Sequence, residues 1–166
     1  LLPSVSPRRS AGGWENGSAT EFPEWSLHWA EMGFAVASVE YRLAPKHPWP
    51  APLEDAKLAI GWPKQNAGRL GISDQCFITA GRSAGGQIAS AVAYGLKEPS
   101  IKGCISLYGP HDMFFARRHA YEDDLLNSLR LLRNYLDGDP EQQEARYTSA
   151  SAILLADRNS CPTLLI

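Results

Sequence analysis

Ser83 is the residue of this chain whose surroundings point most clearly to chemistry. It is the centre of a Gly-x-Ser-x-Gly sequence, Gly81–Gly85, which follows the apolar run Cys76–Ala80 and precedes the small-residue stretch Gln87–Tyr94. This order predicts a strand, a sharp turn and a helix, with the serine hydroxyl presented at the turn. The helix would direct its first amides and its positive dipole end at an oxyanion formed there. The sequence therefore predicts a serine nucleophile, with a Gly/Ser turn of no chemical role as the alternative.

A second candidate for the same chemistry lies upstream, in the segment Ser10–Trp14. Acyl transfer needs backbone N–H groups aimed at the oxyanion of the tetrahedral intermediate. Glycine has no Cβ, so the amides of Gly12 and Gly13 can approach closely, and with the amide of Ala84 they are the expected oxyanion hole. A plain Gly-Gly turn before a helix is the alternative. Three aromatic residues are candidate walls of a substrate pocket, with core packing as their alternative: Trp14, Phe114 and Phe115.

Alternating strands and helices are expected to hold these groups. The predicted strands are Phe34–Tyr41, Cys76–Ala80, Ile101–Tyr108 and Thr163–Ile166. The predicted helices are Leu53–Asn66, Gln87–Tyr94 and Tyr121–Leu136. Strands that alternate with helices predict an α/β fold, a largely parallel sheet with helices on both faces. We expect residues 1–166 to be a single, partial domain of this class.

Composition narrows the range of partners. The 166 residues are 44% hydrophobic and 20% charged, with a net charge of −2, which is typical of a soluble globular domain and gives no reason to expect nucleic acid. No apolar run has the length of a membrane span. The three cysteines lie in or beside apolar runs without metal-type spacing, so no metal is expected: Cys76, Cys104 and Cys161. Their odd number favours a reducing, cytoplasmic compartment.

Several segments together resemble one family. Tyr41–Asp55 resembles the Y-R-L-A-P-E-H-x-x-P-A-x-L-E-D stretch of the hormone-sensitive-lipase-like esterases and their bacterial carboxylesterase relatives. Gly81–Gly86 resembles their nucleophile elbow, Ser10–Trp14 a degraded form of their H-G-G-G-W oxyanion motif, and Leu107–Asp112 their Y-G-P-x-D stretch. The resemblance covers residues 10–166. It implies an α/β-hydrolase core, a helical lid insertion around residues 113–150, and a cofactor-free serine esterase for short-chain acyl or aryl esters.

The departures from the family pattern matter for activity. Ser10 and Ala11 replace the family's His and first Gly, and the resemblance implies a chain truncated at both ends. In this fold the triad order is Ser, then Asp or Glu, then His. The resemblance places that acid and that histidine beyond Ile166, so the 166-residue chain alone is expected to be inactive. Asp112 and His119 follow Ser83 in the same order and form an alternative triad, with a surface or lid role as the competing interpretation.

Three other functional classes stay open from the sequence. A catalytically dead esterase can serve as a ligand-binding protein, as plant gibberellin receptors do. A truncated or mis-spliced product would have no function. An amidase such as a kynurenine formamidase-like enzyme would use the same machinery on a different bond. In the enzyme interpretation the expected partner is a small-molecule ester, and the oligomeric state is open.

Overall fold

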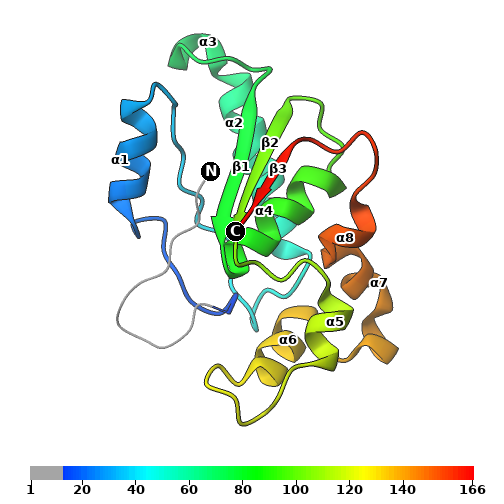
Figure 1. Cartoon of the computed structure of the whole chain (residues 1–166). Helices are drawn as coiled ribbons and strands as arrows, with labels where there is room; N and C mark the ends of the chain where they lie inside the picture. Colours follow the sequence, from blue (N-terminus) through cyan, green and yellow to red (C-terminus); the bar gives the residue numbers. More distant parts are fainter. Residues whose placement is uncertain (1–12) are drawn as a thin grey trace.

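The computed structural model describes residues 13–166, and a parallel three-stranded sheet lies at its centre (Figure 1). The sheet order is β1 (Phe77–Arg82), β2 (Ile101–Leu107) and β3 (Thr163–Leu165). Ala80 of β1 is paired with Ile105 of β2, which in turn is paired with Leu164 of β3. All three carboxyl ends therefore point to one edge of the sheet, where Ser83 follows β1.

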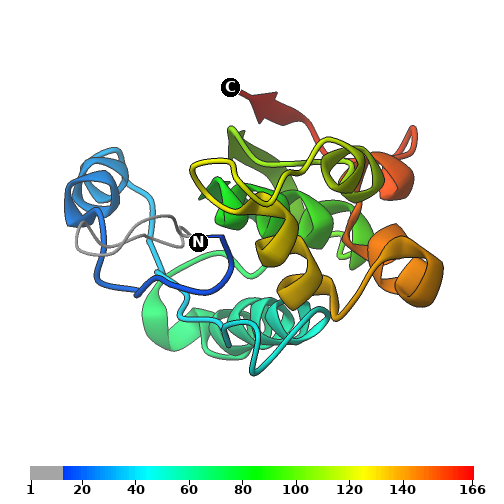
Figure 2. The same cartoon turned by 90° about the horizontal axis from the view of Figure 1, so that it is seen from below.

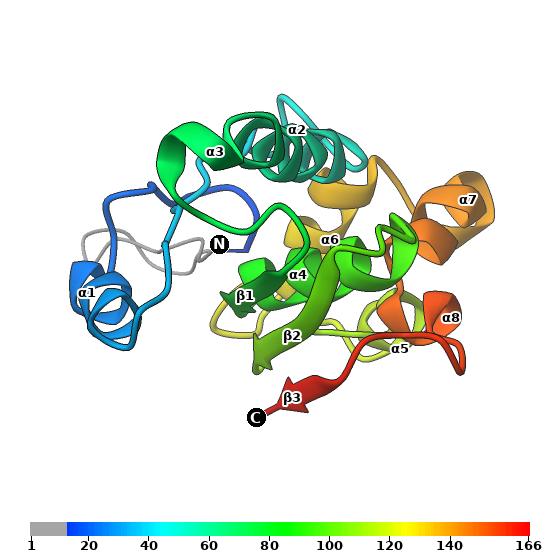
Figure 3. The same cartoon turned by 90° about the horizontal axis from the view of Figure 1, so that it is seen from above.

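Eight helices surround the sheet in this part of the chain: α1 (Pro23–Glu31), α2 (Ala51–Gln65), α3 (Ala67–Leu70), α4 (Ala84–Gly95), α5 (Met113–Arg118), α6 (Ser128–Leu136), α7 (Pro140–Ala150) and α8 (Ala152–Leu155). Helix α4 packs on β1 and β2, while α1 lies on the other side of β1 (Figures 1 and 3). Helices α5 to α8 gather on the side of the molecule away from α1 (Figure 2). This arrangement confirms the predicted α/β class. None of the helices described between residues 13 and 166 is both long and hydrophobic enough to cross a membrane.

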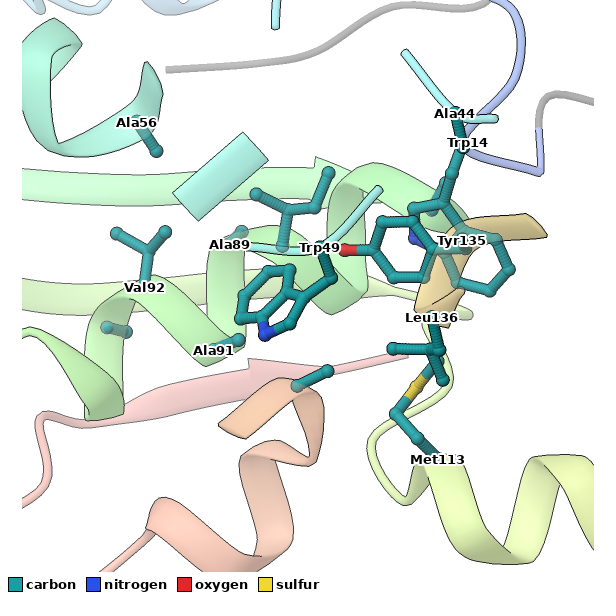
Figure 4. Packing of buried hydrophobic residues seen from close by; sticks show 14 of the residues in the cluster. Trp14, Ala44, Trp49, Ala56, Ala89, Ala91, Val92, Met113, Tyr135 and Leu136 are labelled. Atoms are coloured by element: carbon teal, nitrogen blue, oxygen red, sulfur yellow. The ribbon is translucent and has the colours of Figure 1, made fainter. Parts of the chain in front are cut away.

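Helix α4 is the central element of the core, because its residues from Ala84 to Ala93 are all buried. Small side chains on every face let the helix lie close to the sheet and to its helical neighbours at the same time. Around it packs an aromatic group in which Trp49, Tyr135 and Tyr147 are each 0% exposed. Figure 4 shows the rings of Trp14 and Tyr135 lying together, with Trp49 beside them. The sheet and the aromatic residues around it thus hold the helix that follows Ser83 in place.

The strand predicted at Phe34–Tyr41 is absent. That segment is irregular, and a groove of about 830 Å³ separates Phe34–Glu40 from Cys76–Ile78 at the edge of β1. Strand hydrogen bonds require a neighbour about 4.8 Å away. The alternating apolar pattern is typical of a strand, but no strand in residues 13–166 pairs with this segment, and the prediction is wrong for that reason.

The helix predicted at Tyr121–Leu136 begins later than expected, at Ser128. The carboxylate of Asp124 accepts hydrogen bonds from the backbone N–H groups of Leu126 and Ser128. Side-chain bonds of this kind compete with a helix and favour a turn. Asn127 then begins the helix with φ 50°, and its side chain accepts from the N–H of Arg130. The leucine spacing indicated the helix correctly, while the local turn set where it starts.

Asp139 connects three of the helices in residues 113–150. It is the first residue before α7, and its carboxylate binds Arg117 of α5 at 2.7 Å and Arg133 of α6 at 2.9 Å. The hydrogen bonds from Arg133 and from Arg117 lower the pKa of Asp139 from 3.8 to about 2. The ionised carboxylate is therefore favoured in the folded state, and Asp139 stabilises the packing of α5, α6 and α7.

We expect Asp139→Asn to lower the free energy of unfolding at pH 7 by about 1–2 kcal/mol, after allowance for partial solvent screening. The folded pKa lies below the unfolded one, so this contribution is complete above pH 4 and disappears as the pH falls toward 2. Urea unfolding at several pH values measures it. Asp137→Asn, which weakens the ion pair between the exposed Asp137 and the partly buried Arg146, is the control and should change stability by less than about 0.5 kcal/mol. Equal effects of the two variants would contradict the prediction.

Candidate active site

Ser83 lies at the strand-to-helix turn that the sequence predicts, between the end of β1 and the start of α4. Its backbone has φ 50° and ψ −122°, a conformation that residues with a Cβ rarely adopt. Its N–H donates to the Leu107 carbonyl at 2.8 Å, and its own carbonyl accepts from the N–H of Gln87 at 3.1 Å. These bonds hold the strained turn, and the Ser83 side chain stays partly exposed at its apex.

The turn is possible because β1 and α4 approach each other at glycines. A Cβ on Gly81 would collide with the backbone carbonyl of Gly85, one turn into the helix. The first N–H groups of a helix have no partner within it. The amide of Ala84, the first residue of α4, is therefore available at the end of the helix where the dipole is positive.

We expect Ser83→Gly to be more stable than Ser83→Ala by about 1 kcal/mol. Glycine relieves the strain of the positive φ, worth about 1–3 kcal/mol, but has a larger loss of chain entropy on folding. Chemical denaturation of the two variants gives the difference. At Ser73, an exposed position without a positive φ, the order should reverse, with the alanine variant the more stable. If Ser83→Ala were more stable than Ser83→Gly, the backbone at this position would not be strained as proposed.

The expected oxyanion loop is described in part. Gly12 lies outside the described residues. Gly13 has φ 38° and Trp14 has φ 63°, so both belong to a tight left-handed turn. The Trp14 carbonyl accepts from the N–H of Ala44 at 3.0 Å, and the Trp14 indole donates to the Gln87 side chain at 3.0 Å. The turn is thus attached to α4 within one helical turn of Ser83.

The segment Tyr41–Asp55 packs against that turn and holds it through Ala44. The backbone N–H of Arg42 donates to Asp55 at 2.7 Å and its guanidinium binds the same carboxylate at 2.9 Å, which closes the segment on itself. Trp49 is fully buried, and its backbone N–H donates to the Tyr135 carbonyl at 2.8 Å. The segment therefore holds Ala44, the partner of Trp14, at a fixed place.

The three aromatic residues expected around a pocket have different surroundings. Trp14 is 6% exposed and stacked on Tyr135, with ring centroids 4.4 Å apart. Phe114 packs against Tyr147, with centroids 5.3 Å apart. Phe115 is 57% exposed and stacked on His119. The structure thus assigns Trp14 and Phe114 to packing contacts and leaves Phe115 at the surface.

Asp112 and His119 are not brought together. They lie at opposite ends of α5: the Asp112 carboxylate accepts from the N–H of Phe115, and the His119 ring is 2.9 Å from the Phe115 carbonyl. His111 lies between the hydroxyls of Ser90 (3.1 Å) and Ser106 (3.4 Å), and burial lowers its pKa. No hydrogen bond found in residues 13–166 links any of these three side chains to the Ser83 hydroxyl.

The remaining chemistry-bearing groups lie elsewhere. All three cysteines are free thiols: Cys76 is exposed, Cys104 is buried and Cys161 is partly buried. No group of three or more His, Cys, Asp or Glu side chains within residues 13–166 has the geometry of a metal site.

The sequence reasoning overlooked Gln87 and Tyr135, whose side chains are both fully buried and bonded to each other at 2.8 Å. A signal for Gln87 was present: it is the largest polar side chain in a stretch of mostly small residues, Ala84–Ala93, that is buried throughout. Buried amides are normally hydrogen-bonded, so this position implies partners from other elements. Which partners these are follows only from the fold.

Comparison with known proteins agrees with this geometry. The BD-FAE family model matches residues 10–166. Carboxylesterase NlhH of Mycobacterium tuberculosis is 41% identical over 83 residues, which are 49% of this chain and 26% of that protein. A solved structure titled Bacterial Heroin Esterase has a TM-score of 0.77 at 26% identity, covering 93% of this chain and 53% of that chain. The hyperthermophilic esterase from the archaeon Pyrobaculum calidifontis has a TM-score of 0.76 at 30% identity, covering 93% and 54%.

The chain therefore spans about half the length of these solved relatives. The TM-scores show that it shares their fold over that length. The family match covers nearly all of the chain, from residue 10 to the end of β3. On this evidence the chain belongs to the BD-FAE family of α/β-hydrolase esterases.

Proposed function

We propose that the protein containing this chain hydrolyses carboxylic esters through an acyl-enzyme formed on Ser83. The observation that carries the proposal is the backbone of Ser83, which is held at φ 50° between a strand and the first residue of a buried helix. Strained backbone of this kind concentrates at functional sites, because other contacts must maintain it. The names of its relatives, a carboxylesterase and two esterases, support the reaction class.

In the proposed first step the Ser83 Oγ attacks the ester carbonyl while a histidine takes its proton. The negative oxygen is stabilised by the amides of Ala84 and Gly13, together with that of Gly12. The C–O bond then breaks and the histidine returns the proton to the leaving alcohol. Water, deprotonated by the same histidine, attacks the acyl group and regenerates the Ser83 hydroxyl.

The proposal assigns the histidine and its acid to polypeptide beyond Ile166. The sheet supports this assignment, because β3 runs parallel to β1 and its last residue, Leu165, is paired with Ser106 near the end of β2. Chain that continues from β3 leaves the sheet at the edge where Ser83 lies. In an open α/β sheet, ligands bind outside this edge.

The substrates we propose are esters with short acyl chains or aryl leaving groups. Amides are the principal competing class, because the same serine chemistry acts on both. A matched pair of substrates with the same acyl group, one an aryl ester and one an anilide, separates them by the ratio of kcat/KM.

The test combines labelling with turnover. The purified protein, including its polypeptide beyond Ile166, is treated with a fluorophosphonate, which transfers its phosphonyl group to an activated serine with loss of fluoride, and the labelled peptide is identified by mass spectrometry. We expect the label on Ser83 and hydrolysis of 4-nitrophenyl acetate that the label abolishes. A folded protein that binds the ester saturably with no turnover and no label would be a ligand-binding protein, and the proposal would then be wrong.

A further inference from the structure

Gln87 is a fully buried side chain that joins three distant segments beneath the candidate site. It lies in the first turn of α4, four residues after Ser83. Its Oε1 accepts from the indole N–H of Trp14 at 3.0 Å and from the hydroxyl of Tyr135 at 2.8 Å. Its Nε2 donates to the carbonyl of Ala150 at 2.8 Å. Both lone pairs of the amide oxygen are thus used.

Gln87 contacts both halves of the candidate site, Ser83 through its backbone and Trp14 through its side chain. The backbone N–H of Gln87 donates to the carbonyl of Ser83 at 3.1 Å. Its side chain binds Trp14, which directly follows Gly13. A buried polar group without a partner is costly, so each of these bonds resists displacement. Gln87 is therefore a direct link between the Gly13 turn and Ser83.

The indole of Trp14 has little freedom to satisfy this bond in another way. Its ring stacks on Tyr135 with an interplanar angle of 10°, and Trp49 closes the other side of Tyr135 edge-on at 6.0 Å (Figure 4). The carbonyl of Trp14 is held by Ala44. A shift of the turn would break the bond to Gln87 and the stacking together.

We infer that Gln87 is a positioning residue that holds the Gly13–Trp14 turn in register with Ser83. The inference rests on the proposed function, in which the Gly13 amide and the Ser83 hydroxyl act on the same carbonyl group. A displacement of about 1 Å within a catalytic arrangement can lower the rate about 10²-fold. The oxyanion exists only after attack, so this link affects kcat more than KM.

The first test compares Gln87→Met, which keeps the length of the side chain and removes its three bonds, with Trp14→Phe, which removes the indole N–H together with the five-membered ring and keeps an aromatic ring against Tyr135. We expect each to lower kcat for 4-nitrophenyl acetate about 10²-fold, with KM changed less than about threefold. The double variant should lose no more than either single one, because both remove the same link. Tyr147→Phe removes another buried hydroxyl, bonded to Gly138, and should keep kcat within about twofold.

A second readout does not depend on activity. In protein labelled with ¹⁵N-tryptophan, the indole N–H of Trp14 should exchange with solvent about tenfold faster in Gln87→Met and at an unchanged rate in Tyr147→Phe. If wild type and Ser83→Ala hydrolyse the ester equally, the proposed function fails. The exchange rate of the Trp14 indole N–H then still tests whether Gln87 holds the Gly13–Trp14 turn. If Gln87→Met does not fold, Trp14→Phe carries the kinetic test. Unchanged exchange in Gln87→Met, unchanged kcat in Trp14→Phe, or losses that multiply in the double variant would each overturn the inference.

Discussion

Replacing Ser83 by alanine should lower kcat for ester hydrolysis by about 10⁴–10⁶-fold and abolish fluorophosphonate labelling. The alanine removes the attacking oxygen but keeps the Cβ, so the turn between β1 and α4 should persist with its φ of 50°. The remaining oxyanion donors can stabilise attack by water only weakly. Steady-state kinetics measures the loss of kcat, and circular dichroism on the same preparation checks that the fold persists.

Ser90 provides the matched control for this prediction. It is a serine of α4, the helix that follows Ser83, and is 1% exposed; its hydroxyl bonds within α4 and to His111. Ser90→Ala should therefore retain labelling and keep kcat within about threefold, with some loss of stability. Turnover that survives in Ser83→Ala while Ser90→Ala is inactive would move the nucleophile away from Ser83.

Replacing Gly81 by alanine should destabilise the fold by about 3 kcal/mol, the upper end of the range for overpacking, because the core has no room to relax there. The added Cβ would overlap the backbone carbonyl of Gly85, which cannot rotate away as a side chain can. Helix α4 would have to move off β1, and the Ser83 turn would move with it. Guanidinium unfolding, or soluble yield where the variant does not fold, reports the effect.

The control is a glycine in open surroundings. Gly61 lies inside α2, and a Cβ there would meet nothing within 4 Å. Gly61→Ala should increase stability by about 0.5–1 kcal/mol, because alanine loses less chain entropy in a helix. A Gly81→Ala protein as stable as Gly61→Ala would show that the approach of β1 and α4 is not tight.

Local sequence patterns were sufficient to predict the strands and the helix around Ser83. The apolar run before Gly81 and the small residues after Gly86 predicted β1 and α4, and the run from Ile101 predicted β2. These segments are short, strongly patterned and bounded by glycine or proline, so neighbouring residues decide their conformation. Phe34–Tyr41 has a similar pattern but became irregular, because a strand also needs a partner and pairing is not local.

The sequence by itself determined the position of Ser83 on a glycine-flanked turn, and with it the family. Only the tertiary structure decided which distant groups surround that turn. The Gln87 side chain forms hydrogen bonds with Trp14, 73 residues away, and with Ala150, 63 residues away. It also separated Asp112 from His119, which had satisfied the order of a triad, by placing them at the two ends of α5. The physical reason is that a turn depends on residues a few positions apart, whereas a buried hydrogen bond depends on how whole elements pack.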